Sequence, residues 1–584
     1  MFTWWKQRKN ASSARTSRYR PVLENLERRE TPTAAVNVGA TINISQAIGN
    51  QKDQSVVINP INPNQVASFA NIEDITGDGA GDPGLFEAWS TDGGQTWNSQ
   101  YLFTDTTSLD EANSAPHAAW DRFGNLFVAY TTRLGDVAVA HSLDGGQTFF
   151  SQVLTADGLH TAGQVSIAVG PALRPNLSSV WIAYRVNANP AGFVIAPHIE
   201  TVHAFTVGLG LISPFSGIPD IVPGSDAANG GPNAITVGPR GRVMVSYEST
   251  GGPPAGPSQL WSNVDPDGLG SAPWGLRRLI TGSNVGFDRV IPANGATSHI
   301  DAAPGLAWDN STGRHRGRVY FTYVDAPTTA SNDTNIFLRY SDDNGVTWSA
   351  PQRINNDGGA GSQFLPAVAV DQSTGIVAVA WYDARNSAQN TVTQVFAAVS
   401  ADGGVTFGNN FMVSPDQINA GLSAPPATTD VSSGVGFFSQ ISFVQGNLQI
   451  NWSDNSNTLP GNPDPLHMDT ATARVRVAPI LRVKVIFPSR WRLIDRVNSI
   501  YFGRLTIINN SGFDLRGPFT LTMTLPNASL RFLVPANTQV GTTVTFTITN
   551  NLRNRVPLRV VALLSNPLHF KLPSSLIGFA TTLA

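Results

Sequence analysis

Hydrophobic and polar residues alternate with a period of two along most of this 584-residue chain, in short runs separated by turn residues. Such alternation predicts β-strands with one buried face. Between residues 36 and 478 one unit recurs seven times: an alternating strand, a turn, and a second strand that ends in an aromatic residue. The first strands of these units start near Ser55, His117, Val165, Asn233, Pro304, Pro366 and Gln440. The pattern therefore predicts an all-β protein built from repeats.

A shorter motif recurs inside this unit, with the pattern Ser-x-Asp-x-Gly-x-Thr-aromatic. Its four copies are Ser90–Trp97, Ser142–Phe149, Ser341–Trp348 and Ser400–Phe407, and Ser262–Trp274 looks like an eroded fifth. Each copy predicts a hairpin turn whose Asp accepts backbone N–H groups and whose Gly, or Asn344, takes a positive φ. The motif resembles the Asp-box, or bacterial neuraminidase repeat, of sialidases and related β-propellers. That resemblance implies that the box joins the third and fourth strands of a blade, opposite the ligand pocket, and is structural.

Seven units favour a sialidase-like β-propeller of seven four-stranded blades, with six, the number in true sialidases, as the alternative. The last unit lacks an outer strand, and the alternating residues 35 to 45 are predicted to supply it. We therefore assign residues 35–478 to the propeller. Residues 479–584 alternate with period two and predict a C-terminal immunoglobulin-like β-sandwich.

Residues 1–34 form a basic segment without an apolar core of the signal-peptide kind. Within it, residues 21–29 have the pattern Pro-x-Leu-Glu-x-Leu-Glu-x-Arg, which resembles a motif near the start of many large exported bacterial proteins. The resemblance implies an exported protein, extracellular or on the cell surface. A disordered basic tail is the alternative interpretation.

The net charge of −3 conceals an uneven distribution, with balances of +5 in residues 1–30, +10 in residues 480–584 and −18 between them. An acidic centre suggests cation binding, and the basic C-terminal domain suggests attachment to an anionic envelope surface, although a solvated surface explains both equally. Cysteine is absent, which excludes disulfides, thiolate metal sites and a Cys nucleophile. We expect no nucleic-acid partner, because the basic tracts lack interleaved aromatic residues, and no transmembrane segment, because no apolar run approaches about eighteen residues.

If the boxes mark one end of the propeller, the starts of first strands and the ends of second strands meet at the other. Charged and aromatic residues at these positions could bind a carbohydrate or another cell-surface ligand. The candidates are His117, Tyr130, Arg133, Arg185, Tyr247, Glu248, His299, Asp301, Asp325, Tyr382, Asp383, Arg385 and Asp454. The alternative is that the Tyr residues serve blade packing and that Asp383 pairs with Arg385.

Hydrolysis is the second hypothesis, because sialidases, which this chain resembles in its Asp-boxes, use a Tyr–Glu nucleophile pair, an Asp acid/base and three Arg. Tyr247 precedes Glu248, but adjacent strand residues point to opposite faces. The family's first Arg lies in an Arg-Ile-Pro segment before the first box, whereas here no Arg stands between Arg29 and Arg122. We therefore transfer no catalytic residue, and an exo-glycosidase of the exo-α-sialidase type, or one using Asp325 with Asp383, stays an alternative to ligand binding. A structural envelope module is the third.

One further motif predicts a cation site. Asp74, Thr76, Asp78 and Asp82 place oxygen-bearing side chains at relative positions one, three, five and nine of a Gly-rich loop. This spacing resembles the calcium loops of integrin-type repeats and the first part of an EF-hand loop. Ca²⁺ is thus the expected ligand, and a metal-free Gly-rich turn is the alternative.

Overall fold

The computed structural model describes residues 34–45, 49–72, 84–104, 111–155, 161–187, 197–225, 232–250, 257–286, 288–295, 298–422, 434–436, 439–456, 467–479, 481–509, 519–525, 527, 529–534, 537–540, 542–548, 557–566 and 575–582. The elements described in these ranges are β-strands and three 3-10 turns, Pro239–Gly241, Pro292–Asn294 and Ala420–Leu422. No helix in the described ranges is long and apolar enough to cross a membrane. The all-β prediction is confirmed.

Among the described residues, the strands up to residue 479 form seven sheets of at least four antiparallel strands, and one two-stranded ribbon. The first three sheets contain β2 (Gln51–Ile58), β3 (Val66–Ile72), β4 (Gly84–Ser90) and β5 (Asn98–Leu102); β6 (Ala112–Trp120), β7 (Leu126–Thr132), β8 (Val137–Ser142) and β9 (Phe150–Val153); and β10 (Thr161–Pro171), β11 (Ser178–Asn187), β12 (His198–Gly208), β13 (Leu211–Ile212) and β14 (Asp220–Ile221). The fourth contains β15 (Pro232–Val237), β16 (Val243–Thr250), β17 (Ser258–Asp265) and β18 (Arg278–Ser283), and the ribbon β19 (Arg289–Val290) and β20 (His299–Ile300) follows it.

The last three sheets contain β21 (Gly305–Trp308), β22 (Val319–Asp325), β23 (Asn335–Ser341) and β24 (Gln352–Arg353); β25 (Gln363–Val370), β26 (Val377–Asp383), β27 (Gln394–Ser400) and β28 (Phe411–Met412); and β29 (Ile441–Val444), β30 (Asn447–Asp454), β31 (Asp469–Pro479) and β1 (Ala34–Asn43). The first strand of each sheet contacts the first strands of the sheets before and after it, and β29 contacts β2. The seven first strands therefore form a closed ring, which makes this part of the chain a β-propeller.

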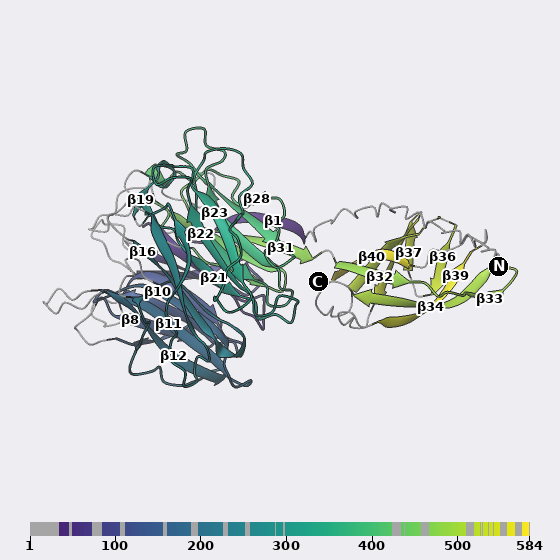
Figure 1. The fold of residues 1–584 in the computed structure, drawn as a ribbon, viewed down its shortest axis with the longest axis horizontal. Coiled ribbons are helices and arrows are strands. Elements are labelled where there is room, and N and C mark those ends of the chain that lie inside the picture. The colour runs from purple at the N-terminus through teal and green to yellow at the C-terminus, as the bar shows by residue number, and fades with distance from the viewer. Residues whose placement is uncertain are drawn as a thin grey trace, which may run out of the picture. The chain divides into compact units, whose positions relative to one another are not determined.

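The ring closes with a strand from the start of the chain. β1 pairs antiparallel with β31, with Ala34 opposite Pro479 and Asn43 opposite Ala471, and Figure 1 shows the purple β1 beside the green β31. At the end of β1 and just beyond it, the Asp469 carboxylate accepts Asn43 Nδ2 at 2.7 Å and Ser45 Oγ at 3.2 Å. The predicted outer strand of the last unit is confirmed.

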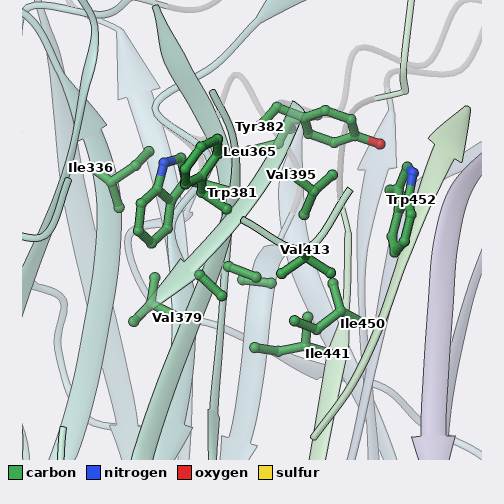
Figure 2. Close-up of a cluster of buried hydrophobic side chains, with 14 of the residues drawn as sticks. Ile336, Leu365, Val379, Trp381, Tyr382, Val395, Val413, Ile441, Ile450 and Trp452 are labelled. Atoms are coloured by element: carbon green, nitrogen blue, oxygen red, sulfur yellow. The ribbon is translucent and has the colours of Figure 1, made fainter. Parts of the chain in front are cut away.

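Aromatic residues that end the second strands lie between sheets. Tyr130, Tyr184, Tyr247, Tyr323, Tyr382 and Trp452 are all buried. Figure 2 shows part of the largest buried cluster, where Trp381, Tyr382 and Trp452 pack with aliphatic residues of the last three sheets. The repeated aromatic position in the sequence is thus explained by packing between blades.

The four Asp-boxes form the same turn between the third and fourth strands of their sheets. In the first box, Asp92 Oδ1 accepts the Ser90 hydroxyl at 2.8 Å and Thr96 N at 3.0 Å, while Asp92 Oδ2 accepts Thr96 Oγ1 at 2.6 Å. The Asp144, Asp343 and Asp402 carboxylates accept the corresponding three bonds. Positive φ values occur at Gly93 (78°) and Asn344 (60°), as predicted. The eroded box keeps a shortened turn, in which Asp267 accepts Ala272 N at 3.2 Å and Gly268 has a φ of 59°. Its aromatic residue, Trp274, packs edge-on against Trp181.

The C-terminal strands form one continuous sheet in the described residues. It comprises β32 (Leu481–Ile486), β33 (Arg492–Asp495), β34 (Ile500–Asn509), β35 (Phe519–Thr524), β36 (Arg531–Val534), β37 (Asn537–Val540), β38 (Thr543–Ile548), β39 (Leu558–Ser565) and β40 (Ser575–Thr582). β36 and β37, the strands at the two edges of this sheet, lie close together, and Asn537 Nδ2 donates to Phe532 O at 2.8 Å between them. The sheet thus curls around one core. An immunoglobulin-type arrangement of two separate sheets stays a prediction.

Removal of one box carboxylate should destabilise the propeller without unfolding it. Asp402→Ala removes the acceptor of three hydrogen bonds, to the Ser400 hydroxyl and to the backbone and side chain of Thr406. We expect a loss of about 2 kcal/mol in the free energy of unfolding, measured by urea denaturation. Thr406→Val removes one of these bonds and should cost less than half as much. An equal loss in the two variants would contradict a carboxylate-centred turn.

Candidate functional site

The Asp-boxes define the two ends of the propeller. They connect third to fourth strands, so the first strands begin, and the second strands end, at the opposite end. We call this the strand-start end. All thirteen predicted ligand-binding residues lie at or near first-strand starts, second-strand ends or the segments that adjoin them. Topology therefore places them toward this end, and their burial and partners determine what each can do.

A cavity of about 340 Å³ runs between the first strands of all seven sheets. Aliphatic residues such as Val57, Ile167, Leu306 and Val368 line most of it, and His117 is the one predicted ligand-binding residue in its lining. Polar backbone and side-chain atoms are exposed between these aliphatic side chains, and such a mixture occurs in small-ligand sites. The remaining predicted residues lie behind the cavity wall or farther out.

His117 belongs to a series of hydrogen bonds between neighbouring first strands. Ala118 N donates to Ser55 Oγ at 2.9 Å, Ile167 N to His117 Nδ1 at 3.2 Å, and Ile235 N to Ser166 Oγ at 3.3 Å. His117 thus accepts a backbone N–H where the sheets on either side use Ser. Burial lowers the pKa of His117 to about 4, so the imidazole is neutral at pH 7.

His117 should make stability depend on pH. Its pKa is lower in the folded chain than its ordinary value of about 6.5, so its contribution is present above pH 6.5 and is lost as pH falls towards 4. His117→Ser keeps an acceptor of the kind used by Ser55 and Ser166 but does not titrate. Between pH 7 and pH 5, the wild type should lose about 2 kcal/mol more than this variant. Parallel pH profiles in thermal unfolding would contradict the assignment.

Backbone strain recurs where first strands enter the ring. Asp53, Gln164, Ala303 and Leu365 all have φ between 44° and 55°. Three of them coincide with register shifts against the second strand, between Lys52 and Ser55, Gly163 and Val165, and Phe364 and Ala367. Non-glycine residues in this region are strained, and such residues concentrate at functional sites. Gln164 and Leu365, at two of these bulges, line the cavity, and so does Ala303.

Two buried carboxyl groups stand behind this wall, between the fourth and fifth sheets. Glu248 has no exposed surface, and its Oε2 accepts Ala302 N at 3.1 Å. Asp301 Oδ1 accepts Asp288 N at 3.0 Å. Burial, followed by the charge of Asp301, raises the pKa of Glu248 to about 8, and burial raises the pKa of Asp301 to about 6. Oε1 of Glu248 has no hydrogen-bond partner among the described residues. The pair therefore holds a proton at neutral pH.

Neutralising Glu248 should stabilise the protein at alkaline pH. Because its folded pKa is raised, the stability that the protonated carboxyl contributes is full below about pH 4.5 and is lost as pH rises through 8. Glu248→Gln keeps the acceptor for Ala302 N without titrating. Between pH 5 and pH 8, its advantage over the wild type should grow by on the order of 3 kcal/mol in chemical denaturation. Asp301→Asn is the matched variant. Its stability advantage over the wild type should appear at lower pH, because the pKa of Asp301 is raised only to about 6.

The ends of β26 and β30 share one arrangement. Trp381 Nε1 donates to Asp383 Oδ2 at 2.7 Å, and Trp452 Nε1 donates to Asp454 Oδ2 at 2.8 Å. Asp383 also accepts Arg385 Nη2 at 2.6 Å, so the predicted alternative of an internal Asp383–Arg385 pair holds in the structure. These carboxylates fix the second-strand ends and have little exposed surface.

Most of the other candidates also have partners inside the protein. Tyr382 accepts Ser453 N at 2.8 Å, and Asp325 accepts Asn284 N at 2.8 Å. Tyr130 is buried and stacks on Phe103, with ring centroids 4.9 Å apart. Their contact with a ligand stays a prediction, because packing accounts for each in this structure.

The remaining predicted residues lie around the fourth sheet and the outer parts of the second and third. Tyr247 is buried, and its hydroxyl donates to Gly224 O at 3.4 Å, away from Glu248. His299 Nδ1 lies 2.9 Å from Asp288 O. Burial lowers the pKa of Arg185. Arg133 is half-exposed and pairs with Glu111 at 2.5 Å.

No set of three free Arg faces a Tyr–Glu pair among the described residues. Arg385 pairs with Asp383, Arg133 with Glu111, and Arg289 donates Nη1 to Thr329 O at 2.7 Å. The described residues also contain no group of three or more Asp, Glu or His that could hold a metal ion. The predicted calcium ligands Asp74, Thr76, Asp78 and Asp82 lie outside the described residues. The Ca²⁺ site stays a prediction.

Sequence reasoning missed the polar residues that link neighbouring first strands and one buried acid. Ser55 and Ser166 link first strands, Gln440 Nε2 donates to Ala118 O at 3.1 Å, and Glu87 is buried beside the next Asp-box, where it accepts Gln100 Nε2 at 2.7 Å. An alignment of the seven repeats would have placed Ser55, His117 and Ser166 in one column. No comparable signal marks Glu87.

Comparison with known proteins supports the box assignment. Residues 339–350 match the BNR/Asp-box repeat. None of the curated proteins compared with this chain matches it significantly.

Solved structures similar to this chain are remote. A protein of unknown function from Dyadobacter fermentans has 12% identity and a TM-score of 0.40, covering 76% of this chain and 99% of its own. An α-L-arabinanase from Penicillium chrysogenum has 15% identity and a TM-score of 0.37, covering 63% and 98%. Trypanosoma rangeli sialidase has 10% identity and a TM-score of 0.33, covering 94% and 96%. At these scores, the assignment as a sialidase-like β-propeller depends on the strand pairing and the boxes described above.

Proposed function

We propose that this propeller binds a neutral carbohydrate end in the cavity enclosed by its seven first strands. The observation that carries the proposal is the lining of that cavity. Most of its lining side chains are aliphatic, with polar backbone and side-chain atoms exposed between them. No Asp, Glu, Lys or Arg is among the described residues that line it, and its one titratable side chain, His117, is neutral at pH 7. Apolar surface for sugar faces, with amides and hydroxyls for hydroxyl groups, suits a neutral saccharide better than an acidic one.

The charged residues at the strand-start end support the same choice. Arg133 and Arg385 pair with Glu111 and Asp383, and Arg289 donates to backbone carbonyl oxygens, so a ligand carboxylate would have to displace these partners. Displacing a buried carboxylate leaves an unpaired charge, which costs several kcal/mol. Arg185, by contrast, has an Nε without a hydrogen-bond partner among the described residues. A clamp of three Arg on the carboxylate of sialic acid is therefore disfavoured.

Filling the cavity tests the proposal. Ala119→Phe and Val368→Phe enlarge side chains in the cavity lining, whereas Ala350→Phe enlarges an exposed residue beyond an Asp-box. After a neutral-glycan array identifies ligands, calorimetry should show at least tenfold weaker binding by both cavity variants and unchanged binding by the control. Thermal unfolding checks that each variant is folded. An array without neutral ligands, or cavity variants that bind normally, would contradict the proposal.

Glycoside hydrolysis is the second candidate, because Glu248 and Asp301 form a carboxyl pair whose pKa values are set apart, as acid/base catalysis requires. It ranks second because Glu248 has no exposed surface. Release of reducing ends from neutral and sialylated substrates should be measured for the wild type, Glu248→Gln and Asp301→Asn. Turnover that survives both substitutions would exclude this pair as the catalytic residues.

A further inference from the structure

The C-terminal sheet has a face that differs from its core side. Strand residues alternate, so Val485 and Leu505 point into the core, whereas Lys484 and Arg504 are exposed on the outer face. We propose that this outer face, with the β33–β34 hairpin, docks the protein on a lipid bilayer whose surface carries anionic headgroups. The proposal does not depend on the function of the propeller.

Basic residues gather on neighbouring strands of this face. The register places Arg504 of β34 opposite Val561 of β39, and Phe502, two residues before Arg504, opposite Arg492 of β33. Arg559 lies two residues before Val561 on β39 and is therefore a diagonal neighbour of Arg504 on the same face. Figure 1 shows β33, β34, β36 and β39 together at one end of the sheet. Like charges at such spacing repel each other, and an anionic partner relieves the repulsion.

The face carries almost no compensating charge. Residues 480–584 contain 12 Lys and Arg against two acidic residues, Asp495 and Asp514. Asp495 is the acidic residue within the described part of this domain, and its carboxylate accepts Val497 N at 2.9 Å and Asn498 Nδ2 at 2.7 Å. Among the described residues of the C-terminal sheet, no ion pair joins an exposed arginine to a carboxylate. Their charge is therefore available to a partner.

Asp495 also sets the shape of the hairpin turn. Its contacts with Val497 and Asn498 fix residues 496–499, and Ser499 takes a φ of 52°. The turn leaves the Val497 side chain 92% exposed, and Ile494 beside it is 52% exposed. Aliphatic residues presented at the tip of an ordered hairpin, with Arg492 and Arg496 beside them, make an amphipathic projection. Such a projection suits the boundary between headgroups and acyl chains.

The combination of charges and aliphatic residues favours lipid over other anionic partners. An acidic polysaccharide would use the arginines but would leave Val497 and Ile494 in water. A nucleic acid would favour exposed aromatic rings for base stacking, whereas the exposed large side chains of this hairpin are aliphatic. A bilayer with anionic headgroups uses both features, and two weak anchors together give stable attachment.

Vesicle co-sedimentation of the full chain tests the proposal. The protein should bind phosphatidylglycerol–phosphatidylcholine vesicles, bind pure phosphatidylcholine vesicles far more weakly, and dissociate in high salt. Substituting Arg492, Arg496 and Arg504 together by Gln should weaken binding on the order of a hundredfold, about fivefold for each charge. Val497→Ser should weaken binding about tenfold without changing net charge.

Matched controls separate this face from overall charge and from folding. Arg174, Arg278 and Arg316 are exposed on the propeller, and their joint substitution by Gln removes the same charge but should leave vesicle binding intact. Thermal unfolding should be unchanged in Val497→Ser, because that side chain is solvent-exposed. Equal weakening by both triple variants would overturn the proposal. So would binding to soluble polyanions such as polygalacturonate that matches vesicle binding and is insensitive to Val497→Ser.

Discussion

The whole propeller depends on the contacts between neighbouring first strands. Each sheet alone would expose both of its faces, and only the closed ring buries them against the sheets on either side. Backbone N–H groups of Ala118 and Ile167 are satisfied by side chains of the preceding sheet, so the ring is held by directional bonds as well as by apolar packing. These bonds also fix the walls of the central cavity. Fold and candidate site therefore share one set of interactions.

The sequence predicts the repeated parts of this fold because local chemistry determines them. The Asp-box is an example of such a repeated part. The four copies of its sequence pattern form the same hydrogen-bonded turn, even where Asn344 replaces Gly. The predicted first-strand starts near Ser55 and Val165 lie four residues after the observed starts at Gln51 and Thr161, whereas those near Pro304 and Gln440 lie within one residue of the observed starts. The reason is physical: strained residues Asp53 and Gln164 interrupt the alternation, so the regular pattern begins only after the bulge.

The candidate site was harder to predict, because burial and partners arise from tertiary structure. Sequence could indicate that Glu248 and Asp301 lie at strand ends, but it could not show that both are buried and that burial raises both pKa values. It also could not separate Arg133, which is half-exposed, from Arg385, which is held between Asp383 and Asp357. Residue type and topology indicate which end of the propeller carries the candidate residues. Only the packing of the folded chain shows which of their side chains are available to a ligand.

The register of the closing strand has a mechanical consequence. Ala34 pairs with Pro479, so the chain enters β1 and leaves β31 at the same end of their antiparallel ladder. Tension applied between the N-terminal segment and the C-terminal domain would therefore load the hydrogen bonds between β1 and β31 one after another. It would not load all of them at once, as a shear force would. The strand pair that closes the ring is therefore loaded in the geometry that offers the least mechanical resistance.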